Sequence, residues 1–178
     1  MRDTLFALLA VGLVGLAAPV RAQTPADGFT IHVSAPHIHQ GQQTRPVHHW
    51  CKVQTPEPII VCLLFDSPDP SSALRGVEYI VAKSLTRPGV PRGTWNAFFH
   101  DHEIEINQGH VTVHDMSPEE TQKVVELVKT TDGIIFSLWP ADDTFPTGQV
   151  AMDQAVGHKP LSAEEYAATA RPASTSGP

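Results

Sequence analysis

The stretch VHHWCKVQTPEPIIVCLLFD, residues 47–66, decides which fold we expect for this chain. Two runs rich in β-branched and aromatic residues, 47–53 and 59–66, flank a short segment that contains two prolines. Such runs, separated by a turn-forming segment, are typical of a β-hairpin. We therefore predict two antiparallel strands joined by a turn centred between Pro56 and Glu57.

This hairpin brings together the only cysteines of the sequence, Cys51 and Cys62. Both are equally far from the predicted turn centre, so they face each other on the same side of the sheet. Directly opposite residues have Cβ atoms about 4.5–5.5 Å apart, which is near disulfide reach. Three roles stay open at this point: a disulfide, two buried free thiols, or a pair with a metal-binding or catalytic use.

The rest of the chain adds strands and a few helices. Alternating or β-branched runs predict strands at 29–35, 74–85 and 134–140, whereas 37–46 is typical of a loop. Ser117, followed by Pro118 and Glu120, has the pattern of a helix N-cap with a capping box, and Ser162 opens a second short helix in the same way. We predict an α+β single domain, a largely antiparallel sheet with one or two helices packed on it.

Histidines cluster in FFHDHEIEI, residues 98–106. In an extended strand, His100 and His102 share a face with Ile104 and Ile106, and the isoleucines mark that face as the inner one. Two imidazoles at positions i and i+2 on an inner face can hold one ion. Neutral imidazole is a common ligand for zinc, copper, iron and nickel.

A second pair, His48 and His49, lies in the hairpin and points to opposite sides of its strand, so at most one side chain joins the first pair directly. Glu78 and Glu105 can orient the rings. We predict a transition-metal site (Zn, Cu, Fe or Ni) formed by His48, His49, His100, His102 and Glu105. Two alternatives stay open: acid–base catalysis without a metal, and a structural seam of hydrogen-bonded histidines. His32, His37 and His39 are expected in water, on or near the loop.

The two ends of the sequence look different from its middle. Arg2, the apolar run 5–18 and the small-residue exit before Ala22 predict a secretory signal peptide over residues 1–22, cut after Ala22. A polar leader, 23–28, a single domain, 29–170, and a disordered tail, 171–178, follow. We expect a periplasmic or secreted protein in an oxidising compartment.

Charge and hydropathy restrict the partners. The net charge of −7 without a basic stripe excludes nucleic acid as a partner. No apolar stretch after the signal is long enough to cross a bilayer, so any membrane contact is expected to be peripheral. The sequence does not specify an oligomeric state.

Several segments together resemble the oil body-associated protein family, a domain of unknown function found in plants, fungi and bacteria. They are HHWC, VCLLFDS, LRGVEYIVAKSL, HDHEIEINQG and LWPADDTFPTG, in that order. The resemblance covers about residues 29–155, and the export signal makes the chain look like an exported bacterial member. The family usually has a histidine two residues before the late tryptophan, where this chain has Ser137. The resemblance implies no established reaction.

Three functions follow from these observations. The first is an exported binding protein with a histidine-rich pocket for a transition metal. The second is a metal-dependent periplasmic enzyme whose metal keeps an open position for water or oxygen. The third is a non-catalytic structural or lipid-surface protein whose histidines only organise the core. No catalytic residue is assigned, because no nucleophile elbow, phosphate loop, HExxH or CxxC motif is present.

Overall fold

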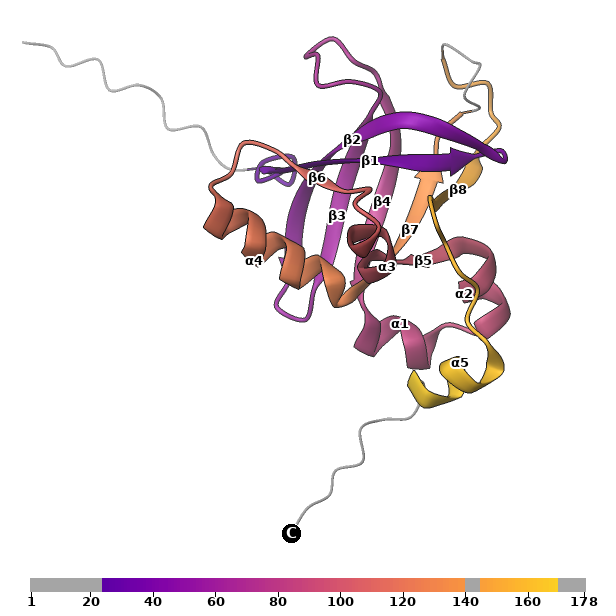
Figure 1. The fold of residues 1–178 in the computed structure, drawn as a ribbon. Coiled ribbons are helices and arrows are strands. Elements are labelled where there is room, and N and C mark those ends of the chain that lie inside the picture. Colours follow the sequence, from indigo (N-terminus) through magenta and orange to yellow (C-terminus); the bar gives the residue numbers. More distant parts are fainter. Residues whose placement is uncertain (1–23, 140–144, 170–178) are drawn as a thin grey trace, which may run out of the picture.

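A computed structural model describes residues 24–139 and 145–169. Figure 1 shows a strongly curved sheet with small helices at its edges. The elements in chain order are β1 (Ile31–His39), β2 (Gln42–Thr55), β3 (Ile59–Phe65), β4 (Leu74–Ala82), α1 (Lys83–Gly89), α2 (Arg92–Phe98), β5 (Phe99–Asp101), α3 (His102–Asn107), β6 (Thr112–Val113), α4 (Pro118–Lys129), β7 (Thr131–Ser137), β8 (Ala151–Ala155) and α5 (Ala163–Thr169).

The sheet closes on itself. Its strands follow the order β2-β3-β4-β7-β8-β1, and β1 pairs with β2 as well, which completes a six-stranded antiparallel barrel. The short strands β5 and β6 pair with β7 and β1 from outside this path. The prediction of an α+β fold, a largely antiparallel sheet with one or two helices packed on it, is therefore wrong: the strands are antiparallel, but the sheet closes into a barrel that encloses its own core, and the helices are small additions to it.

Closure depends on a segment that we expected to be a loop. Residues 37–46 continue β1 and β2 around a tight turn, in which Gln40 and Gly41 adopt positive φ angles of 48° and 81°. Beyond Pro36, His37 pairs with Ala155 and Ile38 with Gln154, which are residues of β8. The loop prediction is wrong because these partners lie more than 100 positions away, where local sequence gives no signal.

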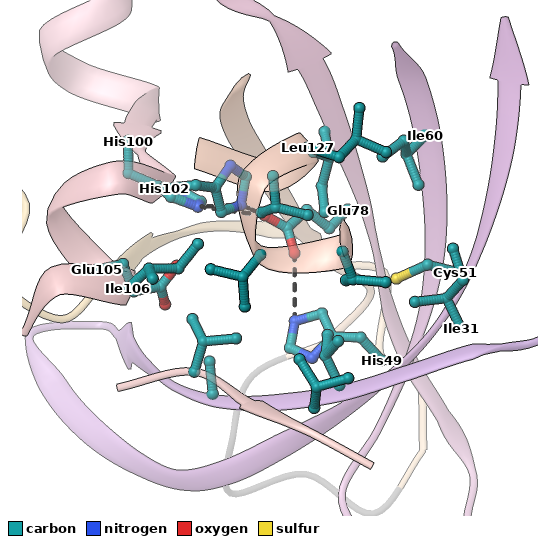
Figure 2. Close-up of a pocket in the computed structure, with 18 of the residues that line it drawn as sticks. Ile31, His49, Cys51, Ile60, Glu78, His100, His102, Glu105, Ile106 and Leu127 are labelled. Carbon is teal, nitrogen blue, oxygen red and sulfur yellow. Dashed lines mark hydrogen bonds and ion pairs between the residues drawn. The ribbon is translucent and has the colours of Figure 1, made fainter. Parts of the chain in front are cut away.

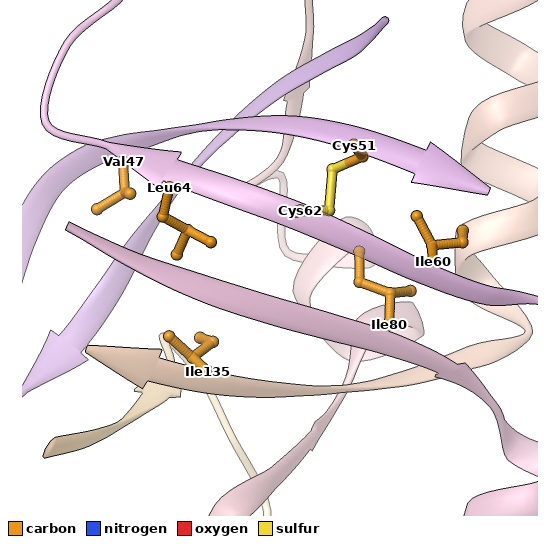
Figure 3. Packing of buried hydrophobic residues seen from close by; sticks show 7 residues of the cluster. All are labelled: Val47, Cys51, Ile60, Cys62, Leu64, Ile80 and Ile135. Atoms are coloured by element: carbon orange, nitrogen blue, oxygen red, sulfur yellow. A yellow bond between two sulfur atoms is a disulfide. The ribbon is translucent and has the colours of Figure 1, made fainter. Parts of the chain in front are cut away.

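The predicted hairpin and its disulfide are confirmed. Cys51 of β2 lies opposite Cys62 of β3, and the two sulfur atoms are bonded. Figure 3 shows this disulfide beside the aliphatic side chains of the core cluster, which belong to residues Val47, Ile60, Leu64, Ile80 and Ile135. A disulfide fits an oxidising compartment. The other two roles considered for the cysteines are thereby excluded.

Strand β4 ends earlier than predicted, because α1 begins at Lys83. The predicted extended strand over 100–106 is also wrong. Strand β5 ends at Asp101, whose side chain caps α3 by accepting a hydrogen bond from the amide of Glu103, 2.8 Å away. Acidic residues in the first turn suit the positive end of the helix. The chain therefore turns sharply between His100 and His102.

The capping-box predictions are confirmed. The Ser117 hydroxyl accepts from the Glu120 amide, and the Glu120 carboxylate accepts from the Ser117 amide, at the start of α4. Ser162 and Glu165 make the same pair of bonds before α5. The apolar stripe of α4 is half-buried and lies over one opening of the barrel; it comprises Val124, Val125, Leu127 and Val128.

The predicted signal peptide (1–22) and disordered tail (171–178) lie outside the described residues. The signal, the tail and the domain boundaries stay predictions. Among the helices in the described ranges 24–139 and 145–169, none is long and apolar enough to cross a membrane.

Candidate metal centre

Glu78 occupies the middle of a cluster of histidines inside the barrel. It lies on β4 between Gly76 and Ile80, and alternation along the strand turns all three inward. Its side chain is only 4% exposed. One carboxylate oxygen, Oε1, lies 3.2 Å from Nε2 of both His100 and His102. The other carboxylate oxygen faces the opposite wall of the barrel (Figure 2).

His49 and His37 form that opposite wall. Nε2 of His49 lies 3.2 Å from Oε2 of Glu78 and 3.1 Å from Nε2 of His37. His49 points inward from β2, between Val47 and Cys51, and His37 points inward from β1, two residues after Ala35. Both rings are almost fully buried. Adjacent strands thus present two imidazoles on the same side of the Glu78 carboxylate.

His100 and His102 come from the junction of β5 and α3. Their rings lie 4.7 Å apart at 75° to each other, and their Nε2 atoms are 3.3 Å apart. The backbone is not extended from His100 to His102, because β5 ends at Asp101 and α3 begins at His102. Both rings nevertheless point at Glu78. Gly133 of β7 lies opposite His100, and a Cβ atom there would overlap this ring and the Glu78 carboxylate. The glycine provides the space that the cluster needs.

Neighbouring groups fix which nitrogen carries the proton in two of the rings. Nδ1 of His49 lies 3.0 Å from the carbonyl oxygen of Val47, which can only accept, so Nδ1 is protonated. Thr131 donates its hydroxyl proton to the carbonyl of Val128 and therefore accepts from Nδ1 of His102, 3.0 Å away. In the neutral form, both rings direct the lone pair of Nε2 at Glu78.

The cluster shifts the protonation of its members. Burial alone would raise the pKa of Glu78, but the hydrogen bonds from the surrounding histidines outweigh it, so this pKa lies well below its usual value. Burial would lower the pKa of His102, yet the hydrogen bond and the charge of Glu78 raise it. Burial, reinforced by His49, lowers the pKa of His37 well below 6.5. Glu78 is therefore negatively charged although it is buried, and its carboxylate attracts cations to the cluster.

The histidines lie at the wall of a mainly apolar pocket. Its lining includes Ile31, Ile60 and Ile106, together with Leu127 of α4, which lies over the opening (Figure 2). A low-polarity surrounding strengthens every electrostatic interaction within the cluster and limits access of water. Any small molecule that reaches the cluster must therefore fit among aliphatic side chains.

The structure brings together three of the five predicted ligands, His49, His100 and His102. Glu105 is buried and lines the same pocket, but it does not belong to any of the three groups of possible metal ligands found among the described residues. His48 points out of the barrel, on the other face of β2, as the alternation of the strand requires.

Two members of the cluster, Glu78 and His37, were not in the predicted ligand set. Glu78 was expected only to orient the rings. His37 was expected in water, because residues 37–46 were predicted to form a loop. The alternation of Ile31, Val33 and Ala35 would have placed His37 on the inner face, had it been continued through the proline. His32 and His39, also expected in water, are buried as well.

The position where the resembling family has histidine lies outside this cluster. Ser137 donates a hydrogen bond to Oδ2 of Asp153, 2.6 Å away, and Oδ1 of the same carboxylate lies 2.6 Å from Nδ1 of His39. Ser137 therefore belongs to a second polar group, between β7, β8 and the end of β1. The cluster around Glu78 is complete without a side chain from this position.

Comparisons with known proteins identify relatives without assigning a reaction. Residues 23–171 match the family model described as "Protein of unknown function (DUF1264)". The chain is 30% identical over 130 residues to oil body-associated protein 1B of Arabidopsis thaliana, covering 71% of this chain and 52% of the relative. It is 32% identical over 135 residues to oil body-associated protein 1A of Zea mays, covering 72% and 55%. The chain thus spans about half the length of these relatives, and no solved structure matches it.

Proposed function

Because the chain belongs to the DUF1264 family, whose description names no reaction, the interior cluster has to carry the argument, and we propose that the protein binds a transition-metal ion on Glu78 and the histidines around it. The ligand atoms come from His49 and His37 on one side of the carboxylate and from His100 and His102 on the other. This set keeps three predicted ligands and replaces His48 and Glu105 with His37 and Glu78.

The proposal rests on one observation: the unprotonated Nε2 atoms of two histidines face the carboxylate of Glu78. His49 and His102 are oriented through Nδ1, so their neutral rings present the unprotonated Nε2 to oxygen atoms of Glu78 at 3.2 Å. Two acceptors at this distance repel unless a cation lies between them. That cation is either an added proton on each ring or a metal ion. We propose the metal, because several buried imidazoles and one carboxylate are the ligand types that a transition-metal ion takes.

The spacing of the ligand atoms supports the same conclusion. Metal–nitrogen bonds of about 2.0–2.1 Å at tetrahedral angles separate neighbouring ligand atoms by about 3.3–3.4 Å. The observed separations among Nε2 atoms and Glu78 oxygens are 3.1–3.3 Å. Imidazole and carboxylate without thiolate suit zinc, copper, iron or nickel. Little rearrangement is needed to bind such an ion.

The test is metal content in protein purified without a histidine tag. We expect about one ion per chain or more, and a Glu78→Gln variant that loses most of it, because the amide keeps the shape but not the charge. Glu103→Gln, an exposed substitution on the same small helix as His102, serves as the matched control and should keep the metal. Less than about 0.2 ion per chain, without recovery after zinc, copper, nickel or iron is added, contradicts the proposal.

The apolar pocket beside the cluster supports a metal-dependent enzyme as a second candidate. Each ligand group of the described cluster offers three atoms, the number that catalytic zinc sites use when one position stays open. Substrates would be small and mainly apolar, since aliphatic residues line the approach. Binding of azide to the cobalt- or copper-loaded protein, followed by its visible absorption, tests for an open position. An unchanged spectrum argues for a closed binding site.

A peripheral lipid contact is the third candidate, and a separate surface supports it. Tyr79, Phe136 and Met152 expose 36–40% of their surface on the outside of β4, β7 and β8, and Phe136 pairs directly with Met152. The plant relatives are named oil body-associated proteins. Co-sedimentation with phosphatidylcholine vesicles tests the contact, with Phe136→Ser as the comparison. Protein that stays wholly in the supernatant excludes it.

A further inference from the structure

A second group of histidines lies on the outer face of the barrel, separate from the interior cluster. It consists of His32 on β1, His48 on β2 and His114 after β6. One ring nitrogen from each lies within 4.8 Å of the other two. His48 and His114 are half-buried and His32 is 9% exposed, so water reaches the group. Because His48 and His49 point to opposite sides of β2, the two clusters cannot share ligands.

We propose that His32, His48 and His114 form a second, surface-accessible binding site for a borderline-soft divalent ion such as Cu²⁺ or Zn²⁺. This site does not depend on the function proposed for the interior cluster. Three imidazoles without a carboxylate or thiolate in the ligand set select these ions over Mg²⁺ and Ca²⁺. Its accessibility makes it an exchangeable site, in contrast to the enclosed cluster around Glu78.

The orientation of His32 supports the proposal. Its Nδ1 lies 3.3 Å from Oδ2 of Asp115, a carboxylate that accepts the Nδ1 proton. The neutral ring then directs the Nε2 lone pair toward Nδ1 of His48, 2.9 Å away. A carboxylate behind a metal-binding imidazole is the usual arrangement around bound metal ions, because it fixes the ring and raises its basicity.

The backbone around His114 supports it as well. The amide of His114 donates to the carbonyl oxygen of His32, 2.9 Å away, and the next residue, Asp115, has a positive φ of 57°. A non-glycine residue in this region is uncommon, and aspartate is one of the few types that adopt it more often. This turn places the His114 ring on the His32 ring, at 4.3 Å between centroids, and returns the Asp115 carboxylate to Nδ1 of His32.

The competing interpretation is a stack of rings held only by hydrogen bonds. Ser34 lies 2.8 Å from Nε2 of His114, and Nδ1 of His48 can donate to His32. Both bonds can persist in the absence of metal, so the static geometry does not exclude this interpretation. The two interpretations differ in what happens when an ion is added.

Trp50 supplies a local reporter. Its ring stacks on His32 at 4.3 Å with an angle of 8° between the planes. Paramagnetic Cu²⁺ bound by His32 will quench its fluorescence. The experiment titrates Cu²⁺ into tag-free protein and records tryptophan emission, and Trp50→Phe identifies the part of the signal that belongs to Trp50.

We expect a saturable loss of Trp50 emission. His114→Ala and His48→Ala should weaken the apparent affinity of this step about tenfold or more, and Asp115→Asn about tenfold. Glu78→Gln should leave it in place, because that variant alters only the interior cluster. Unchanged circular dichroism, and retention of the interior metal where the wild type has one, will show that the surface variants are folded.

Three results overturn the proposal. The first is a Cu²⁺ titration that leaves Trp50 emission unchanged. The second is quenching with the same midpoint in wild type, His48→Ala and His114→Ala. The third is loss of the quenching step in Glu78→Gln, because the quenching then comes from the interior cluster and not from a surface site. The proposal for the interior cluster fails in a different way: wild type and Glu103→Gln would then both lack metal when their metal content is measured.

Discussion

Gly133 lies against the imidazole of His100, on the strand that pairs with the one carrying the histidine. A Cβ atom at this position would overlap Nε2 and Cε1 of His100 and Oε1 of Glu78. These atoms are the far ends of flexible side chains, so Gly133→Ala should displace the ligands more than the backbone. We predict a loss of about 1–3 kcal/mol in stability and about 10–100-fold in interior metal affinity.

The comparison for this prediction is Gly93→Ala in α2, where a Cβ atom meets nothing within 4 Å. Alanine there should raise helix stability slightly and leave metal binding unchanged. Competition with a chromophoric chelator measures affinity, and urea unfolding measures stability. Equal metal affinity in Gly133→Ala and wild type would show that the ion does not lie beside His100.

The disulfide should contribute measurably to stability. Cys51 and Cys62 are 11 residues apart, and closing a loop of that size in the unfolded chain contributes about 2–3 kcal/mol. We predict that dithiothreitol lowers the urea midpoint of the wild type. The double variant Cys51→Ala/Cys62→Ala should start lower and not respond to the reductant. A wild type whose midpoint is unchanged after complete reduction would contradict the prediction.

Local sequence patterns predicted the β2–β3 hairpin, the Cys51–Cys62 pairing and the capping box at Ser117, because each depends on residues close together in the chain. Barrel closure depends on the pairing of His37 with Ala155, and no periodicity within either segment specifies that partner. The fold class was wrong for this reason.

The candidate site was predictable only where its geometry depends on residues close together in the chain. Alternation along β2 correctly separated His48 from His49. The HxH pair does converge, but through the turn at Asp101, which an extended strand does not contain. An aspartate followed by acidic residues is a helix-start signal, and in this segment it competes with the apparent alternation of a strand. The central position of Glu78 became visible only when distant strands were placed around it.

Arg87 links the strand that carries His100 to the barrel wall. Its guanidinium bonds Asp132 of β7 at 2.6 and 2.7 Å and Asp101 of β5 at 3.0 Å. Asp132 is completely buried, and Trp95 also donates to it. Arg87→Met leaves this carboxylate without its cation, so we predict a loss of about 3–5 kcal/mol and a weaker interior metal site.

The double variant Arg87→Met/Asp132→Asn separates the buried charge from packing. Removing both charges should restore much of the stability lost in Arg87→Met, because an unpaired carboxylate no longer has to be desolvated. Urea unfolding of the four proteins, wild type, both singles and the double, gives the coupling energy. Additive effects of the two substitutions would mean that the ion pair contributes nothing specific.

The pH dependence of stability can be tested at His158, which belongs to neither of the two proposed metal sites. Its Nε2 lies 3.1 Å from the carbonyl oxygen of Asn96, and its ring lies beside Trp95. Burial lowers the pKa of His158; the Asn96 carbonyl opposes this shift, and His100 adds to it. As the pH falls, the unfolded chain therefore takes up a proton at this residue before the folded chain does.

The direction in which stability changes with pH follows from this order of protonation. The stability that neutral His158 contributes is fully present above its unfolded pKa of about 6.5 and is lost as the pH falls toward the lower folded pKa. We predict that metal-free protein loses stability between about pH 7.5 and 5.5, and that His158→Gln loses less over this range. Lowered pKa values at His37, His48 and His114 add to this loss, whereas the raised pKa of His102 opposes it. Urea midpoints in the presence of a chelator measure both curves. Parallel curves for the two proteins would show that His158 titrates alike in the folded and unfolded states.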